Sequence, residues 1–394
     1  MSRNMHQKSE IVTKIDMKTK NILKATFNGF SIKDKEMLIS NKISESSVIF
    51  RLWSSLTSDE KMYMKQYFEK VIAIENQPKE PILIGNHNLA LLDIKYPDLY
   101  EMLIKHYSNF WIKQELDLKD DFKQYEKLSK EKKHFVKMIL GFFAQADGLV
   151  NKNLETNFAE EVKIPEAQMF YHFQIAAEDI HRDMYSEMIK TYIKNDEERD
   201  YLFNAIDNIS VIKNKADWMN MWMHRELNSF HERLIAFAIV EGVFFSSAFC
   251  AVFWFKKQNI LPGFTTSNEF IARDEGLHRD FACLLYSKLE NKLSTERIHE
   301  MMKGAYKCES DFVDECLNVE LIGMKAAQMK QYVQYCIDHL LINLGVPELY
   351  KVENPFPWMK LQSMYGKGNF FEKRNTQYNK SIVGENNSMF DFGF

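Results

Sequence analysis

Four Glu-x-x-His pairs occur in this 394-residue sequence, and two of them have the surroundings expected of a metal site. Side chains three residues apart share one face of a helix, so each pair presents a carboxylate and an imidazole together. Glu178/His181 and Glu275/His278 share the frame Glu-x-x-His-Arg-Asp and lie in long stretches with helical periodicity. Both side-chain types bind divalent transition metals. The two pairs are interpreted as two halves of one metal site.

The other two pairs are interpreted as background. With this content of acids and histidines, chance alone produces about 1.5 such matches in a chain of this length. Glu131/His134 lies in Lys-Glu-Lys-Lys-His, and Glu296/His299 lies in Thr-Glu-Arg-Ile-His-Glu. These charged surroundings predict solvated helix starts rather than ligands.

Glu241 is the one charge in the 22-residue apolar run from Leu234 to Phe255. Such a run is long enough to cross a bilayer, which is one reading. No second run of this kind exists and the neighbouring helices are amphipathic, so we favour a helix at the centre of a bundle, apolar on all sides because it is surrounded. A buried carboxylate costs several kcal/mol unless a cation compensates it. Glu241 is therefore a third candidate ligand.

Asp117, in Glu115-Leu-Asp-Leu118, is added as the sixth ligand. Four carboxylates and two imidazoles from four separate segments form the ligand set of ferritin-like proteins, in which a helical bundle holds two metal ions. This set suits iron or manganese better than a structural zinc site, which prefers cysteine.

Long helices must position these ligands. With only 14 Gly and 8 Pro residues, the chain has few turn formers. Periodicity predicts an all-α, ferritin-like bundle over residues 51–345, with a capped helix opening at Thr57-Ser-Asp-Glu60. Residues 1–50 are expected to be loosely ordered, and residues 346–394 to be irregular with a mobile end. The expected helices of the bundle are 98–114, 130–162, 166–193, 196–225, 229–257, 267–290, 295–317 and 319–344.

Composition limits the partners and the compartment. The net charge of -4 provides no basic field for a nucleic acid. Five cysteines without a CxxC pair indicate a reducing compartment, and the first 20 residues lack a signal-peptide core. We expect a cytoplasmic protein that binds neither nucleic acid nor membrane.

Around these ligands, the sequence resembles the small, radical-generating subunit of class I ribonucleotide reductase, eukaryotic type. The resemblance runs from about residue 80 to the C-terminus. Its most specific segments are Phe110-Trp-Ile-Lys-Gln-Glu-Leu-Asp117, Asp147-Gly-Leu-Val-Asn-Lys-Asn-Leu154, residues 173–185, Val240-Glu-Gly-Val-Phe-Phe245, Ile271-Ala-Arg-Asp-Glu-Gly-Leu-His278 and Asn369-Phe-Phe-Glu-Lys-Arg374.

The resemblance implies a division of the ligands between two iron or manganese ions that activate O2. Asp117, Glu178 and His181 would bind one ion and Glu241, Glu275 and His278 the other, with a carboxylate or two bridging. Tyr185 would store the radical, and its position one turn after His181 places it on the same helix face. Phe245, Phe249 and Ile271 would surround it.

The family's route for the oxidising equivalent also maps onto this chain. The resemblance implies a path from His181 through Asp274, with Arg273 alongside, to the tail residue Tyr378. An ungapped alignment places Tyr100 where the family has a tryptophan between the aspartate and the tail. Tyrosine must lose its phenolic proton on oxidation at neutral pH, so Tyr100 would change the transfer step.

The C-terminus resembles the apolar peptide with which the family docks on its large subunit, the nucleotide-reducing partner. The aromatic and apolar anchors would be Met389, Phe390, Phe392 and Phe394. A homodimer is implied as well. Two alternatives stay open: a divergent paralogue that mainly supports an authentic small subunit, suggested by Tyr100 and Ser388, and a ferritin-like ferroxidase.

Overall fold

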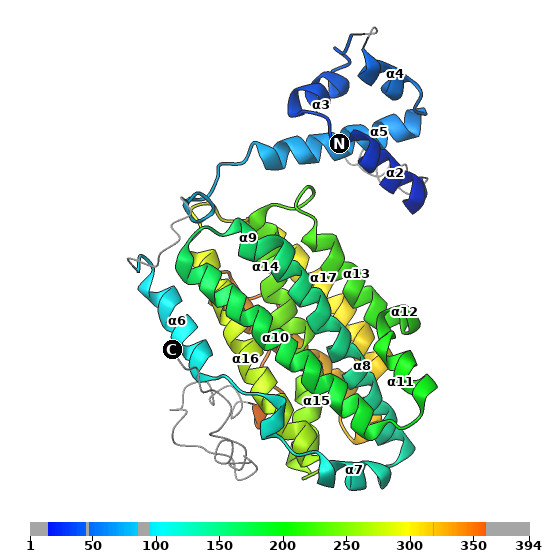
Figure 1. Ribbon diagram of the computed structural model, residues 1–394, viewed down its shortest axis with the longest axis vertical. Coiled ribbons are helices and arrows are strands. Elements are labelled where there is room, and N and C mark those ends of the chain that lie inside the picture. Colours follow the sequence, from blue (N-terminus) through cyan, green and yellow to red (C-terminus); the bar gives the residue numbers. More distant parts are fainter. Residues whose placement is uncertain (1–14, 45–46, 86–93, 318, 360–394) are drawn as a thin grey trace, which may run out of the picture. The chain divides into compact units, whose positions relative to one another are not determined.

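A computed structural model describes residues 15–44, 47–85, 94–317 and 319–359 of the chain (Figure 1). These residues form helices joined by short connections, and no β-strand occurs within the described ranges. The chain divides into two compact units. The smaller contains the chain up to Lys79 together with His224–Ser229, and the larger contains the remainder.

The smaller unit has a core of its own. It contains α2 (Met17–Phe27), α3 (Ile32–Ile39), α4 (Val48–Ser54) and α5 (Ser58–Glu75). Phe27, Trp53 and Phe68 pack together at its centre. The predicted cap is confirmed, because Thr57 and Glu60 form a reciprocal capping box at the start of α5. The expectation of loose order over residues 1–50 is wrong for their described part, since buried apolar side chains at helical spacing hold α2 and α3 in this core.

The larger unit is a helical bundle whose long members carry the predicted ligands. α10 (Pro165–Tyr192) packs against α8 (Lys130–Asn153) and α6 (Pro97–Ser108). α16 (Pro262–Ser287) packs against α14 (Phe230–Ile239), α15 (Ser246–Lys257) and α6 (Figure 1). The predicted all-α, ferritin-like class is confirmed. The helices are α6 (Pro97–Ser108), α7 (Lys119–Glu126), α8 (Lys130–Asn153), α9 (Ala159–Glu161), α10 (Pro165–Tyr192), α11 (Asp196–Phe203), α12 (Ala205–Asn208), α13 (Ser210–Met223), α14 (Phe230–Ile239), α15 (Ser246–Lys257), α16 (Pro262–Ser287), α17 (Thr295–Phe312) and α18 (Ala326–Asn343).

The apolar run around Glu241 is a core helix, as the sequence predicts. Phe230–Lys257 is long and apolar enough to cross a membrane, yet 89% of its most apolar stretch lies inside the protein. A π-helical turn, Val240–Phe244, interrupts it between α14 and α15. Such turns insert one extra residue per turn and are frequent at functional sites. Here the turn contains Glu241.

The position of α16 is set at its first turn. α16 begins at Pro262, whose missing N–H costs nothing at this position. The buried carboxylate of Asp121, on α7, accepts hydrogen bonds from the backbone N–H of Gly263 at 2.8 Å and of Phe264 at 2.7 Å. Two N–H groups that lack partners within the helix are thereby satisfied. This contact ties the helix that carries two predicted ligands to α7.

Candidate metal centre

The two Glu-x-x-His pairs meet face to face in the core of the larger unit. Glu178 and His181 project from α10, and Glu275 and His278 project from α16. All four side chains are buried, with at most 3% of each residue exposed. The structure thus brings together the two pairs that the sequence predicts to be halves of one site.

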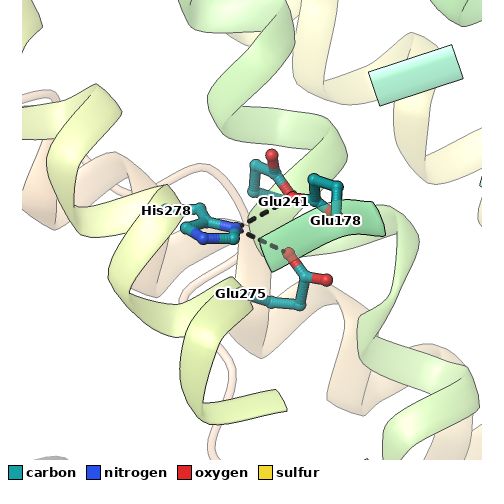
Figure 2. Close-up of side chains that lie close together, drawn as sticks. All are labelled: Glu178, Glu241, Glu275 and His278. Atoms are coloured by element: carbon teal, nitrogen blue, oxygen red, sulfur yellow. Dashed lines mark hydrogen bonds and ion pairs between the residues drawn. The ribbon is translucent and has the colours of Figure 1, made fainter. Parts of the chain in front are cut away.

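Each of the two carboxylates faces both imidazoles. Figure 2 shows Glu178 and Glu275 on either side of one of them, His278. His278 Nδ1 lies 3.0 Å from Glu178 Oε1 and 3.1 Å from Glu275 Oε2. His181 Nδ1 lies 3.2 Å from Glu178 Oε2 and 3.2 Å from Glu275 Oε1. One oxygen of each carboxylate therefore points to each histidine. This is the placement that two bridging carboxylates between two metal ions require.

Glu241 completes one side of this cluster. Its carboxylate lies with Glu178, Glu275 and His278 in a group whose ligand atoms are all within 4.8 Å of one another. Gln174, one turn before Glu178 on α10, donates from Nε2 to Glu241 Oε1 at 2.9 Å. Glu241 Oε2 has no hydrogen-bond partner among the described residues.

Asp147, rather than Asp117, completes the other side. Asp147 on α8 is 1% exposed and groups with Glu178 and His181 within the same 4.8 Å limit. The assignment of Asp117 is wrong. That side chain is 47% exposed, accepts the N–H of Lys119 at 2.8 Å and lies 3.9 Å from the Lys119 ammonium. Its carboxylate stabilises the turn into α7 at the surface instead of entering the core.

A signal for Asp147 was present in the sequence. It is the one charged residue between Met138 and Val150, a stretch that α8 buries almost completely. Like Glu241, Asp147 is a lone acid within an apolar helix. Asp147 is also the first residue of the segment 147–154, one of those that carry the family resemblance.

The two background pairs lie elsewhere, as predicted. Glu131 and His134 are both exposed at the start of α8. Glu296 is exposed in the first turn of α17, and His299 Nε2 lies 2.8 Å from the carbonyl oxygen of Pro347. Neither pair belongs to a group that could hold a metal ion within the described residues.

The electrostatics of the cluster require positive charge. Burial, followed by repulsion from neighbouring carboxylates, raises the pKa of Asp147 and of Glu241 well above the usual carboxyl range. Burial opposes protonation of His278, but hydrogen bonds to Glu178 and Glu275 raise its pKa to about 9. Without metal, the site therefore takes up protons in place of cations.

The residues present fit a pair of divalent ions. Four carboxylates and two imidazoles compose the donor set, and cysteine, the usual ligand of structural zinc, is absent from these groups of described residues. Asp147 Oδ2 and Glu241 Oε2 lack hydrogen-bond partners among the described residues, so their lone pairs are vacant. Buried polar atoms normally find a partner, and a metal ion would be that partner here.

Tyr185 is entirely buried on α10, one turn beyond His181. Its hydroxyl donates to the amide oxygen of Asn268, on α16, at 3.2 Å. Burial, followed by the negative charge of Asp147, raises the pKa of Tyr185 well above the usual value. The phenol is therefore neutral and shielded, as the predicted radical residue needs to be.

Phe143, on α8, is the ring that covers Tyr185, and sequence reasoning missed it. The two rings stack with centroids 4.9 Å apart and an interplanar angle of 19°. The predicted pocket residues Phe245 and Phe249 pack on Phe143 at 5.8 and 5.0 Å. Ile271 is 1% exposed on α16, between Asn268 and the metal-facing Glu275. In this pocket Phe143 stacks on Tyr185, and Phe245 and Phe249 pack in turn on Phe143.

The aromatic residue next to Asp274 is Trp111, not Tyr100. Trp111 Nε1 donates to Asp274 Oδ2 at 2.8 Å, and the same oxygen lies 3.3 Å from His181 Nε2. The indole also stacks on His181, with centroids 6.1 Å apart and an interplanar angle of 21°. Arg273 donates to the carbonyl oxygen of Asn109 at 2.5 Å and lies 3.5 Å from Asp274 Oδ1.

Tyr100 and Trp111 lie in different segments because α6 ends between them. The sequence predicts a helix over 98–114, which would make residues 100 and 111 members of one continuous helix. The helix ends at Ser108, and an irregular segment carries Trp111 into the core with 4% exposure. Tyr100 stays on α6, partly buried against the hydrophobic core.

The tail predictions cannot be placed in the fold. Tyr378 and the docking residues Met389, Phe390, Phe392 and Phe394 lie outside the described residues.

Comparison with known proteins agrees with this geometry. A family model described as "Ribonucleotide reductase, small chain" matches residues 88–355, which include every metal-facing side chain described above. The chain belongs to this family. The resemblance inferred from the sequence is thus confirmed, and the chain is a small subunit of ribonucleoside-diphosphate reductase.

Relatives in the family match over most of their length. The ribonucleoside-diphosphate reductase small chain of Spisula solidissima is 46% identical over 349 residues, which cover 88% of this chain and 91% of the relative. Subunit M2 from Mesocricetus auratus is 42% identical over 371 residues, covering 93% of this chain and 94% of that one. The Plasmodium falciparum small chain is 50% identical over 294 residues, covering 75% and 84%.

Solved structures of the family share the fold. The homodimer of the ribonucleotide reductase subunit Rnr4 from Saccharomyces cerevisiae has a TM-score of 0.67 and 29% identity, covering 77% of this chain and 98% of that one. A ribonucleotide reductase R2 subunit from Clostridium botulinum has a TM-score of 0.67 at 22% identity, covering 73% and 95%. The second likeness supports the fold alone.

Proposed function

We propose that this small subunit generates and stores a radical on Tyr185. The observation that carries the proposal is the buried cluster of four carboxylates and two imidazoles in the same core as a neutral, enclosed tyrosine. Iron or manganese ions bound there, with O2 as the oxidant, would supply the oxidising power that a tyrosine needs.

Each of the two ions would be held by one carboxylate and one histidine of its own and by two shared carboxylates. Asp147 and His181 would face one ion, and Glu241 and His278 the other, with Glu178 and Glu275 between them. Gln174 would orient Glu241 through its hydrogen bond.

Oxidation of Tyr185 removes one electron and the phenolic proton, and the pocket would protect the product. Asn268 orients the hydroxyl, and Phe143 covers the ring face. The rings of Phe245 and Phe249 pack on Phe143, and with Tyr185 entirely buried, water and small reductants would have no direct path to the phenoxyl oxygen.

His181, Asp274 and Trp111 would form the exit path of the oxidising equivalent. Their polar atoms form one hydrogen-bonded chain of 3.3 and 2.8 Å. An indole can be oxidised without first losing its proton, and its N–H would stay bonded to Asp274. Tyr378, outside the described residues, would continue the path in the tail.

The partner would be a large subunit that holds the nucleotide. Docking would use the apolar tail residues Met389, Phe390, Phe392 and Phe394. Family members with solved structures include a homodimer, so two copies of this chain would pair. We place this assembly in the cytoplasm.

Electron paramagnetic resonance tests the proposal. The metal-free protein is mixed with Fe2+ and O2, and a tyrosyl signal is expected in the wild type and absent in Tyr185→Phe. Tyr171→Phe is a matched control, since Tyr171 is equally buried on the same helix. A signal that survives Tyr185→Phe, or no signal in a wild type that binds metal, would refute radical storage at this residue.

Neither alternative function gains support from the structure. The paralogue hypothesis rested partly on the absence of a transfer tryptophan, and Trp111 removes that ground. Full turnover with the large subunit alone would exclude it. A ferroxidase would need neither Tyr185 nor the His181–Asp274–Trp111 chain, and it would have to bind many irons per chain.

A further inference from the structure

The outer nitrogens of the two metal-facing histidines meet different partners. His181 Nε2 lies 3.3 Å from a carboxylate oxygen of Asp274. His278 Nε2 lies 3.1 Å from Nε2 of His106, a residue of α6 that is 1% exposed. Histidine ligands usually donate their outer N–H to a carboxylate, a backbone carbonyl or water, and this partner sets the tautomer and the basicity of the ligand. The partner of His278 is another imidazole.

The position of each proton follows from the contacts. His278 Nδ1 faces the carboxylates of Glu178 and Glu275 and is the atom that would bind an ion, so it carries no proton in the metal-loaded state. The single proton of His278 then resides on Nε2. Because only one proton fits between two nitrogens 3.1 Å apart, His106 Nε2 must accept it. The proton of a neutral His106 therefore resides on its Nδ1.

The surroundings of His106 favour this uncharged acceptor. Its ring lies 4.9 Å from the ring of Phe170 and 4.7 Å, edge to face, from that of Phe173. Its Nδ1 has no hydrogen-bond partner among the described residues. The aromatic contacts hold the ring in place, and no carboxylate among the described residues is hydrogen-bonded to it.

We propose that His106 is a positioning residue for the second metal ion, whose Nε2 accepts the hydrogen bond of His278 and so fixes the His278 tautomer that binds metal. The proposal rests on the metal centre proposed above. It also makes the two ions unequal. His181 is supported by a negatively charged acceptor and is the more basic ligand, whereas His278 is supported by a neutral acceptor.

Metal titration of four proteins tests the role. Mn2+ binding to the metal-free wild type, His106→Phe, His106→Gln and His134→Phe is followed by calorimetry, with the manganese resonance spectrum as a second readout. Phenylalanine keeps the ring packing but has no acceptor. Glutamine places an amide oxygen near the position of Nε2. His134 is exposed, so His134→Phe controls for loss of a histidine far from the site.

We expect two Mn2+ ions per wild-type chain and a second ion that binds about tenfold to a hundredfold more weakly to His106→Phe. His106→Gln should recover most of the affinity, and His134→Phe should match the wild type. Equal binding of both ions by His106→Phe would overturn the proposal, and so would an equal loss in the Phe and Gln variants, which would indicate a packing role.

Folding and the metal centre are checked separately. Circular dichroism reports whether each variant is folded, and His106→Leu takes the place of His106→Phe if the latter does not fold. A wild type that binds no divalent ion would overturn the metal centre itself. A wild type that binds two ions, with unchanged binding in His106→Phe, would overturn the role of His106 alone.

Discussion

Replacing Trp111 with phenylalanine is the most direct test of the path out of the metal centre. The substitution keeps a six-membered aromatic ring at a site with 4% exposure and removes the five-membered ring of the indole, with the Nε1–H that Asp274 accepts at 2.8 Å. Asp274 Oδ2 retains His181 Nε2 at 3.3 Å, and Oδ1 retains Arg273 at 3.5 Å. The carboxylate is therefore not left without partners.

The stability cost can be worked from these contacts. A hydrogen bond to a charged group contributes about 1.5–3 kcal/mol, which is the least that Trp111→Phe should cost because buried ring atoms are lost as well. For a chain of this length, an unfolding entropy of about 2.1 cal/mol/K per residue converts that loss into a melting temperature lower by at least about 2–4 °C. The protein should remain folded and should keep its metal ligands.

Two assays separate radical formation from radical transfer. Trp111→Phe should form the Tyr185 radical at close to the wild-type yield, because the pocket around Tyr185 does not include Trp111. Turnover with the large subunit should fall at least about tenfold, or ~1.4 kcal/mol in the barrier. Tyr100→Phe should keep both activities. Normal turnover in Trp111→Phe, or a selective loss in Tyr100→Phe, would refute the assignment of the path to Trp111.

Three further predictions concern charge in the core. Asp147→Asn should weaken binding of one metal ion at least about tenfold, ~1.4 kcal/mol, as calorimetry would measure. It should also raise the melting temperature of the metal-free protein at neutral pH, because the folded state no longer has to protonate this buried carboxyl, whose pKa is raised by burial. Asp117→Asn should change neither quantity. The pKa of His278 is raised to about 9, so its contribution to stability is complete below its usual value of 6.5 and is lost as the pH rises through 9. Metal-free protein should therefore become less stable over this range, and a flat profile would contradict the coupling to the carboxylates. Lys215→Met leaves the buried Glu309 without its ion pair and should cost about 3–5 kcal/mol in urea unfolding; a loss below 1 kcal/mol would argue against a charged pair.

Local spacing made part of the site predictable. Glu178 and His181 are one helical turn apart, as are Glu275 and His278, so each pair shares a face wherever its helix packs. Glu241 was recognisable because a lone acid in an apolar helix must be compensated. Helix positions followed from the same periodicity, and α10 and α16 begin and end within a few residues of their predicted bounds.

Contacts between distant segments were not predictable from spacing. Asp147 carries the signal of a lone acid in an apolar helix, but only the packing of α8 against α10 shows that it reaches His181. Trp111 reaches Asp274, 163 positions later, because α6 stops at Ser108.

The sequence by itself determined the helical class, the two Glu-x-x-His pairs, Glu241 and the neighbouring Tyr185. These features depend on the regular geometry of one helix, which repeats every 3.6 residues whatever surrounds it. Tertiary structure decided which acid completes the cluster, which aromatic side chain contacts Asp274, and that His106 lies behind His278. Those outcomes depend on how helices end and which faces meet, and no local period encodes the distance between residues on different helices.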